Sequence, residues 1–408
     1  MSAAADSAPA EGRRSEERRA MGVAGGAHAL HDGYTDLIYV MLPIWQAEFG
    51  LSYAAIGLLR GVFAGTMAGF QIPSGLLSER LGTPLVLAAG TALAGFGYCL
   101  AVFVDSYTAL IAILLIAGLG ASTQHPLASA LVARAFAGTR SLGALGTYNF
   151  AGDLGKMALP AAASLLVVML PWRTSLALLG LIGLVAAVAI LIWTPRFPAE
   201  AKPSKDVKAD GARAGGAGGF SVLLSIGVID SATRMGFLTF LPFVLTAKGA
   251  SLPAVGLALT LVFVGGAAGK LVCAWIGARI GMVATVWLTE GFTALGILAI
   301  GGYTGLPFQL PLEFVLILLP LIGVALNGTS SVLYGSVPLL VAPEKRTRAF
   351  SVFYTGTIGA GAIAPIFYGL IGDAIGIPHA LMVVAAIVLL TLPLVLILRS
   401  RLAAASAA

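Results

Sequence analysis

The chain has 408 residues, of which 58% are hydrophobic and 10% are charged, and its mean hydropathy is +0.96. Soluble globular proteins carry about 25% charged residues, so this composition disfavours a soluble enzyme, a nucleic-acid-binding protein, a disordered chain and a disulfide-rich secreted domain. The formal charge of +6 would ordinarily favour a nucleic-acid partner, but the positions of the charges explain it differently. Cys99 and Cys273 each stand alone in an apolar run, so we expect small buried residues rather than a disulfide or metal ligands.

A helix that crosses the hydrocarbon core of a membrane needs about 20 mostly apolar residues. The sequence contains twelve such runs in two groups of six. They are 23–48, 52–79, 84–105, 108–136, 140–169 and 172–194 in the first group, and 220–247, 252–279, 282–303, 311–341, 347–373 and 377–399 in the second. We therefore expect an all-α membrane protein with twelve transmembrane helices in two six-helix halves.

Polar segments predict the division of the chain into parts. Residues 1–22 are predicted to be a disordered tail, and 195–219, which is rich in Lys, Pro, Ala and Gly, a flexible linker. The linker separates an N-terminal bundle at 23–194 from a C-terminal bundle at 220–401, and a short tail follows at 402–408.

Lysine and arginine predict the orientation, because cytoplasmic segments of membrane proteins carry an excess of both. With the N-terminus in the cytoplasm, eighteen of the 24 basic residues fall in cytoplasmic segments, and only Arg173 and Lys248 fall in outer loops. We therefore expect both termini and the linker in the cytoplasm. The basic charge then reflects topology, and no nucleic-acid partner is expected.

The two halves match each other in sequence. At an offset of 199 positions the matches include Pro43 with Pro242, Gly57 with Gly256, Arg80 with Arg279 and Gly82 with Gly281; at 206 they include Arg140 with Arg346, Tyr148 with Tyr354 and Gly155 with Gly361. Such parallel repeats are related by an axis along the membrane normal, with the substrate site between them near the midplane.

A stripe of glycines marks the second span. Gly57, Gly61, Gly65 and Gly69 recur every four residues, which places them on one helix face where a neighbouring backbone can approach closely. Static packing is one explanation of the stripe, and an interface at which helices slide during gating is the other.

Residues 75–84, GLLSERLGTP, resemble the loop between spans two and three of the major facilitator superfamily. Gly75, Leu77, Arg80 and Gly82 fit that pattern, and Glu79 stands in for its Asp. The resemblance implies the major facilitator fold over the whole chain. It also implies a gating role for these residues, in which Glu79 and Arg80 latch the cytoplasmic helix ends when the site faces outward.

Within that superfamily, the chain is similar to the fosmidomycin-resistance type of exporter. The matching residues are His28, His31, Asp32, Leu42, Pro43, Gly118, Gly120, Ala121, Ser122, His125, Pro126, Ala133 and Arg134. The resemblance implies an exporter in the bacterial plasma (inner) membrane. Residues 114–116 are apolar where many drug/proton antiporters have an arginine, so the direction of transport stays open.

Ionisable residues inside the spans are the candidate functional groups. A charge at the bilayer centre costs about 2.5–3.5 kcal/mol on insertion scales, so it usually faces a cavity or a partner. The residues near the middle of their spans are Asp36, His125, Asp153, Arg234 and Lys270.

The first span carries the predicted proton-coupling group. His28, Asp32 and Asp36 lie at successive i, i+4 positions on one helix face. Asp32 or Asp36 is expected to carry the coupling proton, with His28 or His31 modulating it. A static polar seam is the alternative.

Cationic residues predict where an anionic substrate would bind. Lys156, Arg234 or Lys270 is expected to bind it, with Asp153 as a displaceable partner of Lys156. The alternative is that Asp153 and Lys156, like Asp230 and Arg234, form intrahelical ion pairs. Further hydrogen-bonding candidates for the substrate cavity are Tyr34, Tyr39, Gln124, His125, Tyr148, Asn149, Asn327 and Tyr354.

Three further residues carry separate expectations. Pro126 is expected to kink the fourth span, because proline removes a backbone hydrogen bond. Its neighbour His125 is either a ligand of substrate or proton, or a satisfied packing residue. Arg60 is expected to snorkel towards the outer surface, whereas Glu290 has no assigned role.

We therefore expect a secondary active transporter that works by alternating access. The first hypothesis is proton-coupled efflux of a small organic compound of drug-like or phosphonate-like type, and the alternative is proton-coupled uptake or exchange of a small organic anion. No catalytic constellation, cofactor or metal is predicted. Residues 265–270 mimic a phosphate-binding loop, but Val264 stands where that loop needs glycine. The expected partners are substrate, protons and the lipid bilayer, and the protein is expected to be a monomer.

Overall fold

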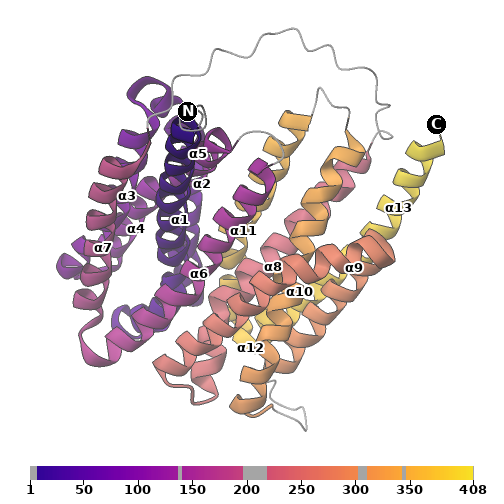
Figure 1. The fold of residues 1–408 in the computed structure, drawn as a ribbon. Helices are drawn as coiled ribbons and strands as arrows, with labels where there is room; N and C mark the ends of the chain where they lie inside the picture. Colours follow the sequence, from indigo (N-terminus) through magenta and orange to yellow (C-terminus); the bar gives the residue numbers. More distant parts are fainter. Residues whose placement is uncertain (1–6, 137–139, 196–217, 302–309, 342–345, 408) are drawn as a thin grey trace. The chain divides into compact units, whose positions relative to one another are not determined.

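The computed structural model describes residues 7–136, 140–195, 218–301, 310–341 and 346–407, and the regular structure in these ranges is helical (Figure 1). The first helices are α1 (Ser7–Phe49), α2 (Tyr53–Leu81), α3 (Thr83–Cys99), the short η1 (Leu100–Phe103), α4 (Tyr107–Ala121), α5 (Gln124–Ala135), α6 (Arg140–Met169) and α7 (Trp172–Trp193). They are followed by α8 (Gly219–Ala247), α9 (Leu252–Ile300), α10 (Leu312–Leu340), α11 (Arg346–Ile375), α12 (Ile377–Leu389) and α13 (Thr391–Ala407).

The predicted all-helical membrane fold is confirmed. Within the described residues, ten helical stretches are long and apolar enough to cross a membrane. The predicted number of twelve stays a prediction. Two features account for the difference: α1 is not among the ten, and α9 covers two predicted spans that meet at a kink at Gly281, whose backbone has φ 80° and ψ 165°.

The chain divides into two compact units. Unit 1 comprises Met1–Ile38 and Gly65–Lys202, and unit 2 comprises Tyr39–Ala64 and Pro203–Ala408. These units differ from the predicted halves in one segment. Residues 39–64, which contain the end of α1 and the beginning of α2, group with the C-terminal part of the chain rather than with the N-terminal bundle.

Glycines allow the helices of unit 1 to pack closely. Helix α3 lies beside α4 and α7 (Figure 1). A Cβ added at Gly95 of α3 would lie 2.6 Å from the carbonyl oxygen of Gly180 on α7. Membrane helices associate through such small residues because lipid gives no hydrophobic drive between them.

Two glycines of the α2 stripe, Gly57 and Gly61, belong to unit 2 and lie against α11. A Cβ at Gly57 would overlap the carbonyl oxygen of Pro365, and one at Gly61 would lie 2.6 Å from that of Ala362. Gly65 and Gly69, by contrast, have no such neighbour within 4 Å. A side chain at Gly57 or Gly61 would therefore collide with α11, whereas Gly65 and Gly69 have room for one.

Pro126 interrupts the fourth predicted span. Helix α4 ends at Ala121, and α5 begins at Gln124. Proline lacks the N–H that would bond to the carbonyl of Ser122, and its ring would clash with that carbonyl in a continuous helix. The expected kink is therefore a break, and it places His125 in the first turn of α5.

The segment predicted as a disordered tail, residues 1–22, is helical from Ser7 onward, because α1 begins there. Glu17 holds this extension: its carboxylate accepts hydrogen bonds from Arg140 Nη1 at 3.0 Å and Nη2 at 2.7 Å, and from Arg13 Nε at 3.3 Å. The Arg140 guanidinium keeps the pKa of Glu17 below its ordinary value. At the other end, α13 extends to Ala407. Most of the predicted linker, 196–217, lies outside the described residues.

Candidate functional site

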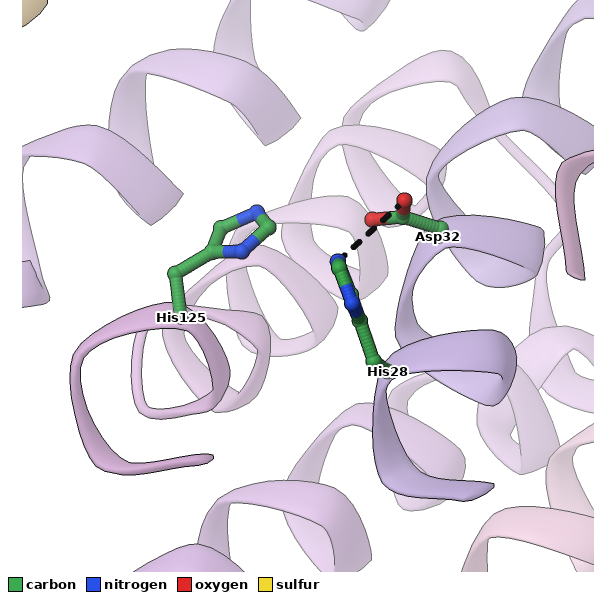
Figure 2. A group of neighbouring side chains, drawn as sticks. All are labelled: His28, Asp32 and His125. Atoms are coloured by element: carbon green, nitrogen blue, oxygen red, sulfur yellow. Dashed lines mark ion pairs between the residues drawn. The ribbon is translucent and has the colours of Figure 1, made fainter. Parts of the chain in front are cut away.

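Three helices of unit 1, α1, α5 and α6, bring together a cluster of ionisable side chains. His28 and Asp32 lie one turn apart on α1, and His125 approaches them from α5 (Figure 2). The His28 Nε2 atom lies 3.4 Å from Asp32 Oδ2. Because His28 and Asp32 are both nearly fully buried, their charges must be balanced locally.

Tyr148 on α6 fixes the tautomer of His28. The His28 Nδ1 atom lies 2.9 Å from the Tyr148 carbonyl oxygen, and the two rings stack with centroids 4.1 Å apart. A carbonyl only accepts, so Nδ1 must carry a hydrogen, and in a neutral ring the Nε2 lone pair would then face the Asp32 carboxylate. Two acceptors repel, so a proton on His28 or on Asp32 is needed to make this contact favourable.

Lys156 adds a permanent positive charge to the cluster. Its Nζ atom lies 3.3 Å from Asp32 Oδ2, and its side chain is 31% exposed. Asp32 is therefore shared between a histidine on its own helix and a lysine on α6. The sequence predicts Asp153 as a partner of Lys156, and this stays a prediction; Asp153 is buried on the same helix. The ion pair between Lys156 and Asp32 joins α6 to α1.

Glycines of α6 make room for the cluster. A Cβ at Gly152 would lie 2.6 Å from Asp32 Oδ2 and 2.8 Å from the His28 ring. A Cβ at Gly155 would overlap the carbonyl oxygen of Ala29. Helix α6 therefore contacts α1 directly at the level of the ionisable group.

His31 and His125 form the far side of the cluster. Their Nε2 atoms lie 3.2 Å apart, so one ring donates a hydrogen and the other accepts it. The His31 Nε2 atom also lies 3.9 Å from Asp32 Oδ1. His125 thus joins the predicted coupling residues His28, His31 and Asp32.

The same side chains have the composition of a transition-metal site. One ligand atom from each of His28, Asp32 and His125 can be chosen so that all lie within 4.8 Å of one another. The Lys156 ammonium, however, already contacts the Asp32 carboxylate. A divalent cation would have to displace this positive charge, so the cluster fits protons better than a metal.

A small cavity of about 10 Å³ adjoins the cluster, and its lining includes His31, Tyr34 and Gln124. That volume holds about one water molecule. Tyr148 Oη donates to Gln124 Oε1 at 3.1 Å, whereas Gln124 Nε2 is buried without a hydrogen-bond partner among the described residues. A water in the cavity would satisfy it.

Three other predicted residues belong to unit 1. Asp36 is buried on α1, and Asn149 is exposed on α6. Tyr34 Oη donates to the Leu179 carbonyl at 2.6 Å, so this tyrosine ties α1 to α7.

The predicted gating residues Gly75, Glu79, Arg80 and Gly82 lie at the junction of α2 and α3. Glu79 and Arg80 are exposed, and the ion pairs and hydrogen bonds of the described chain include neither side chain. Gly82 immediately precedes α3 and has φ 87°, a backbone conformation that favours glycine.

The remaining predicted substrate residues belong to unit 2. Tyr39 Oη donates to Met235 Sδ at 3.4 Å, and Asn327 Nδ2 to the Gly323 carbonyl at 3.3 Å. Tyr354 packs on Tyr334 with ring centroids 4.7 Å apart. Arg234 and Lys270 are half-buried.

Two expectations about charged residues of unit 2 are wrong. Arg60 does not snorkel: it is 3% exposed, with its guanidinium 5.1 Å from the centre of the Tyr39 ring. The delocalised cation is held by the ring face and by Met235 Sδ. In addition, the described residues include no ion pair within 4.0 Å between Asp230 and Arg234.

The contact that sequence reasoning missed is Lys156 with Asp32, because no local spacing joins positions on different helices. Sequence reasoning also left Glu290 without a role, although it lies buried beside Asp230 and Thr329. An acidic residue inside an apolar run was the available signal.

Comparisons with known proteins agree with this fold. A family model described as Major Facilitator Superfamily matches residues 25–225 and 223–407. The chain is 24% identical over 367 residues to the Fosmidomycin resistance protein of Escherichia coli (strain K12), a match that covers 87% of each. It is 25% identical over 375 residues to the Probable sulfoacetate transporter SauU of Cupriavidus necator, covering 83% of each. It is 24% identical to the Probable L-galactonate transporter of Escherichia coli (strain K12), covering 80% of this chain and 77% of that protein.

Solved structures show the same fold. A bacterial homolog of the human lysosomal transporter Spinster matches with a TM-score of 0.74 and 15% identity, over 96% of this chain and 97% of that one. The nucleoside transporter NupG matches with a TM-score of 0.77 and 13% identity, over 94% and 99%. Given these matches and its apolar helices, the chain belongs to the Major Facilitator Superfamily and is a multi-pass membrane transporter rather than an enzyme.

Proposed function

We propose that this transporter couples the movement of a small organic anion to protons, and that Asp32 is the group through which the coupling acts. The observation that carries the proposal is that the Asp32 carboxylate is shared between His28 and Lys156 inside a buried cluster. A carboxylate in this position needs a positive partner, and that partner can be a proton or Lys156.

The expected coupling follows from competition for Lys156. An anion that binds the Lys156 ammonium draws it away from Asp32. The buried carboxylate then lacks part of its compensation, which favours uptake of a proton by Asp32 or His28. Anion and proton therefore bind together, and an inward proton gradient would drive uptake of the anion. The names of two relatives, transporters of sulfoacetate and of L-galactonate, denote organic anions and support this substrate class.

Export of a drug-like or phosphonate-like compound is the second candidate. The similarity to the Fosmidomycin resistance protein favours it. Export requires that substrate and proton exclude each other at Asp32, so that the site binds one on each half of the transport cycle. We place the protein in the bacterial inner membrane as a monomer with both termini in the cytoplasm, a topology supported by the distribution of Lys and Arg.

Flux measurements in proteoliposomes test both candidates. Sulfoacetate, galactonate and fosmidomycin are supplied under pH gradients of either sign, with the gradient collapsed by a protonophore as a reference. We expect uptake of an anion to accelerate when the side of supply is acidic. If the supply side must instead be alkaline, export is the function.

Asp32→Asn tests the coupling group. We expect this variant to lose acceleration by the pH gradient while it still exchanges labelled for unlabelled substrate. Asp105→Asn is the matched control, since Asp105 is exposed and outside the cluster. Gradient-driven transport that survives in Asp32→Asn would remove Asp32 from the role.

A further inference from the structure

Unit 2 contains a second pair of buried acidic side chains, which the proposed function does not use. Asp230 on α8 is 4% exposed and Glu290 on α9 is 2% exposed. Their carboxyl groups lie close enough to act on each other electrostatically. Two ionised carboxylates repel at such a separation in an apolar interior, which favours a proton on one of them.

The charge balance around the pair also calls for one proton. Arg234 lies one turn after Asp230 on α8, and it is the cation that acts on both carboxyl groups. Two ionised carboxylates beside one guanidinium would leave a net negative charge in an apolar interior. A single shared proton makes the group neutral, which greatly reduces the cost of burying it.

Polar atoms at the pair have hydrogen-bonding capacity that the described residues leave unused. Glu290 Oε1 is buried and has no hydrogen-bond partner among the described residues. One turn further on the same face of α9, Thr293 is 1% exposed and its Oγ1 likewise lacks a partner there. A proton, or a water that delivers one, would meet both needs.

Helix α10 contributes hydroxyl groups. The Thr329 hydroxyl contacts Glu290 and also lies 2.7 Å from Thr289 Oγ1, to which it donates. Tyr334, half-buried on the same helix, lies within electrostatic range of Asp230 and Arg234, and its hydroxyl group lies 3.3 Å from Thr357 Oγ1.

Arg60, the buried cation that also approaches α8, contacts Tyr39 and Met235. On the packed helices α11, α12 and α13, Tyr354 contacts Tyr334 rather than the pair, and His379, Arg399 and Arg401 are exposed. Arg234 and Tyr334 remain as titratable groups within electrostatic range of the pair.

We propose that Asp230 and Glu290 form a second proton-binding site of the transporter, which gains and loses its shared proton during the transport cycle. Two protons then accompany each substrate, one through the Asp32 cluster and one through this pair. The first proton rests on the proposed function, whereas the second rests on the geometry of unit 2 alone.

The ratio of protons to substrate tests the proposal. It is obtained in proteoliposomes from the substrate gradient that halts net flux against a fixed pH gradient. We expect a ratio of two for the natural protein and of one for Glu290→Gln and Asp230→Asn. Glu313→Gln is the matched control, because Glu313 is exposed at the start of α10, and it should keep the ratio of two. An unchanged ratio in Glu290→Gln overturns the proposal, as does a flux that follows a sodium gradient instead of the pH gradient.

The two ideas fail separately. If Asp32→Asn keeps a pH-driven flux while Glu290→Gln loses it, the role of Asp32 is wrong and the second site stands. If Asp32→Asn loses the drive and both Glu290→Gln and Asp230→Asn keep the natural ratio, the pair is only structural.

A second measurement needs no variant. An apolar carbodiimide reacts with protonated carboxyl groups within membranes, and peptide mass spectrometry locates the adduct. In the natural protein we expect modification of Asp230 or Glu290 that falls as pH rises, and none at Glu313. A pair that stays unmodified across the pH range, or that reacts equally at every pH, contradicts exchange of the proton.

Discussion

Asp373 on α11 caps the beginning of α2 by accepting a hydrogen bond from the backbone N–H of Tyr53, at 2.6 Å to Oδ1, although the two residues are 320 positions apart. The second carboxylate oxygen accepts from the N–H of Ala54 at 3.0 Å. The first N–H groups of a helix have no partner within the helix, and a negative charge there also favours the helix dipole. The contact therefore attaches residues 39–64 to the rest of unit 2.

We expect Asp373→Ala to loosen this attachment. Loss of a carboxylate cap costs about 0.5–2 kcal/mol, so the amides of Tyr53 and Ala54 should exchange their hydrogens faster. Hydrogen-exchange mass spectrometry in detergent measures this. The control is Asp105→Asn, which should leave exchange at these amides unchanged. Equal protection in Asp373→Ala would mean that the packing of Gly57 and Gly61 suffices.

The second prediction concerns Gly82 and Gly281, which occupy equivalent places in the two sequence repeats. Their backbones have φ 87° and ψ 142°, and φ 80° and ψ 165°, respectively. Residues with side chains rarely adopt this region, and the strain amounts to about 1–3 kcal/mol. We expect Gly82→Ala and Gly281→Ala each to lower the thermal unfolding temperature in detergent.

Gly65→Ala and Gly69→Ala are the controls for this strain. Both positions lie inside α2 with no neighbouring atom within 4 Å of an added Cβ. Alanine is favoured over glycine inside a helix by about 1 kcal/mol, so these variants should be as stable as the natural protein or more so. If all four variants behave alike, the backbone conformation at Gly82 and Gly281 is not what matters.

Much of the fold could be predicted from the sequence because its signals are local. The apolar runs and the kink expected at Pro126 each depend on a few neighbouring residues. The assignment of residues 39–64 to unit 2 could not be predicted, because it depends on contacts with α11 such as Tyr53 with Asp373. The helical start of α1 was missed because Glu17 finds its partner at Arg140 on α6.

The third prediction follows from the depressed pKa of Glu17, which results chiefly from the Arg140 hydrogen bonds. A carboxyl group whose pKa is lower in the folded state than in the unfolded state stabilises the fold at pH values above its unfolded-state pKa. This stabilisation is lost as the pH falls through its folded-state pKa. We therefore expect the start of α1 to detach from α6 in mild acid, at a pH below the ordinary 4.5 of a glutamate.

Limited proteolysis of the arginine-rich segment 13–19 measures this detachment, with an acid-tolerant protease. Glu17→Gln should show the same susceptibility already at neutral pH, because the amide carries no charge. Glu16→Gln, one position earlier, is the matched control and should resemble the natural protein. A segment that is equally resistant at every pH would contradict the role of the ion pair.

Lys156 gives the fourth prediction. Lys156→Met keeps the length of the side chain but removes its charge. Hydrogen bonds to charged groups contribute about 1.5–3 kcal/mol, so binding of an anionic substrate should weaken about 10- to 100-fold. Lys156→Arg should retain most of the affinity, and Lys248→Met, in the loop after α8, should retain all of it. Equilibrium binding to the purified transporter measures the change, and an unaltered affinity in Lys156→Met would show that the anion binds elsewhere.

The candidate site was only partly predictable for the same physical reason as the fold. The i, i+4 spacing of His28 and Asp32 shows on the sequence which side chains meet on α1. The pairing of Asp32 with Lys156 and of His31 with His125 depends on how α1, α5 and α6 pack, which spacing does not reveal. Tyr34 is predicted to line the substrate cavity because it is a polar residue in a span. Its hydroxyl group donates to a backbone carbonyl of α7, a contact that the sequence does not reveal.

The absence of a side chain at Gly155 limits how the ion pair between Asp32 and Lys156 can open. At that point α6 rests directly on the backbone of α1 at Ala29. The two backbones already touch at this level, so the helices cannot come closer together there. The ion pair therefore opens through rotation of the lysine side chain, through a competing anion or proton, or through separation of the two helices.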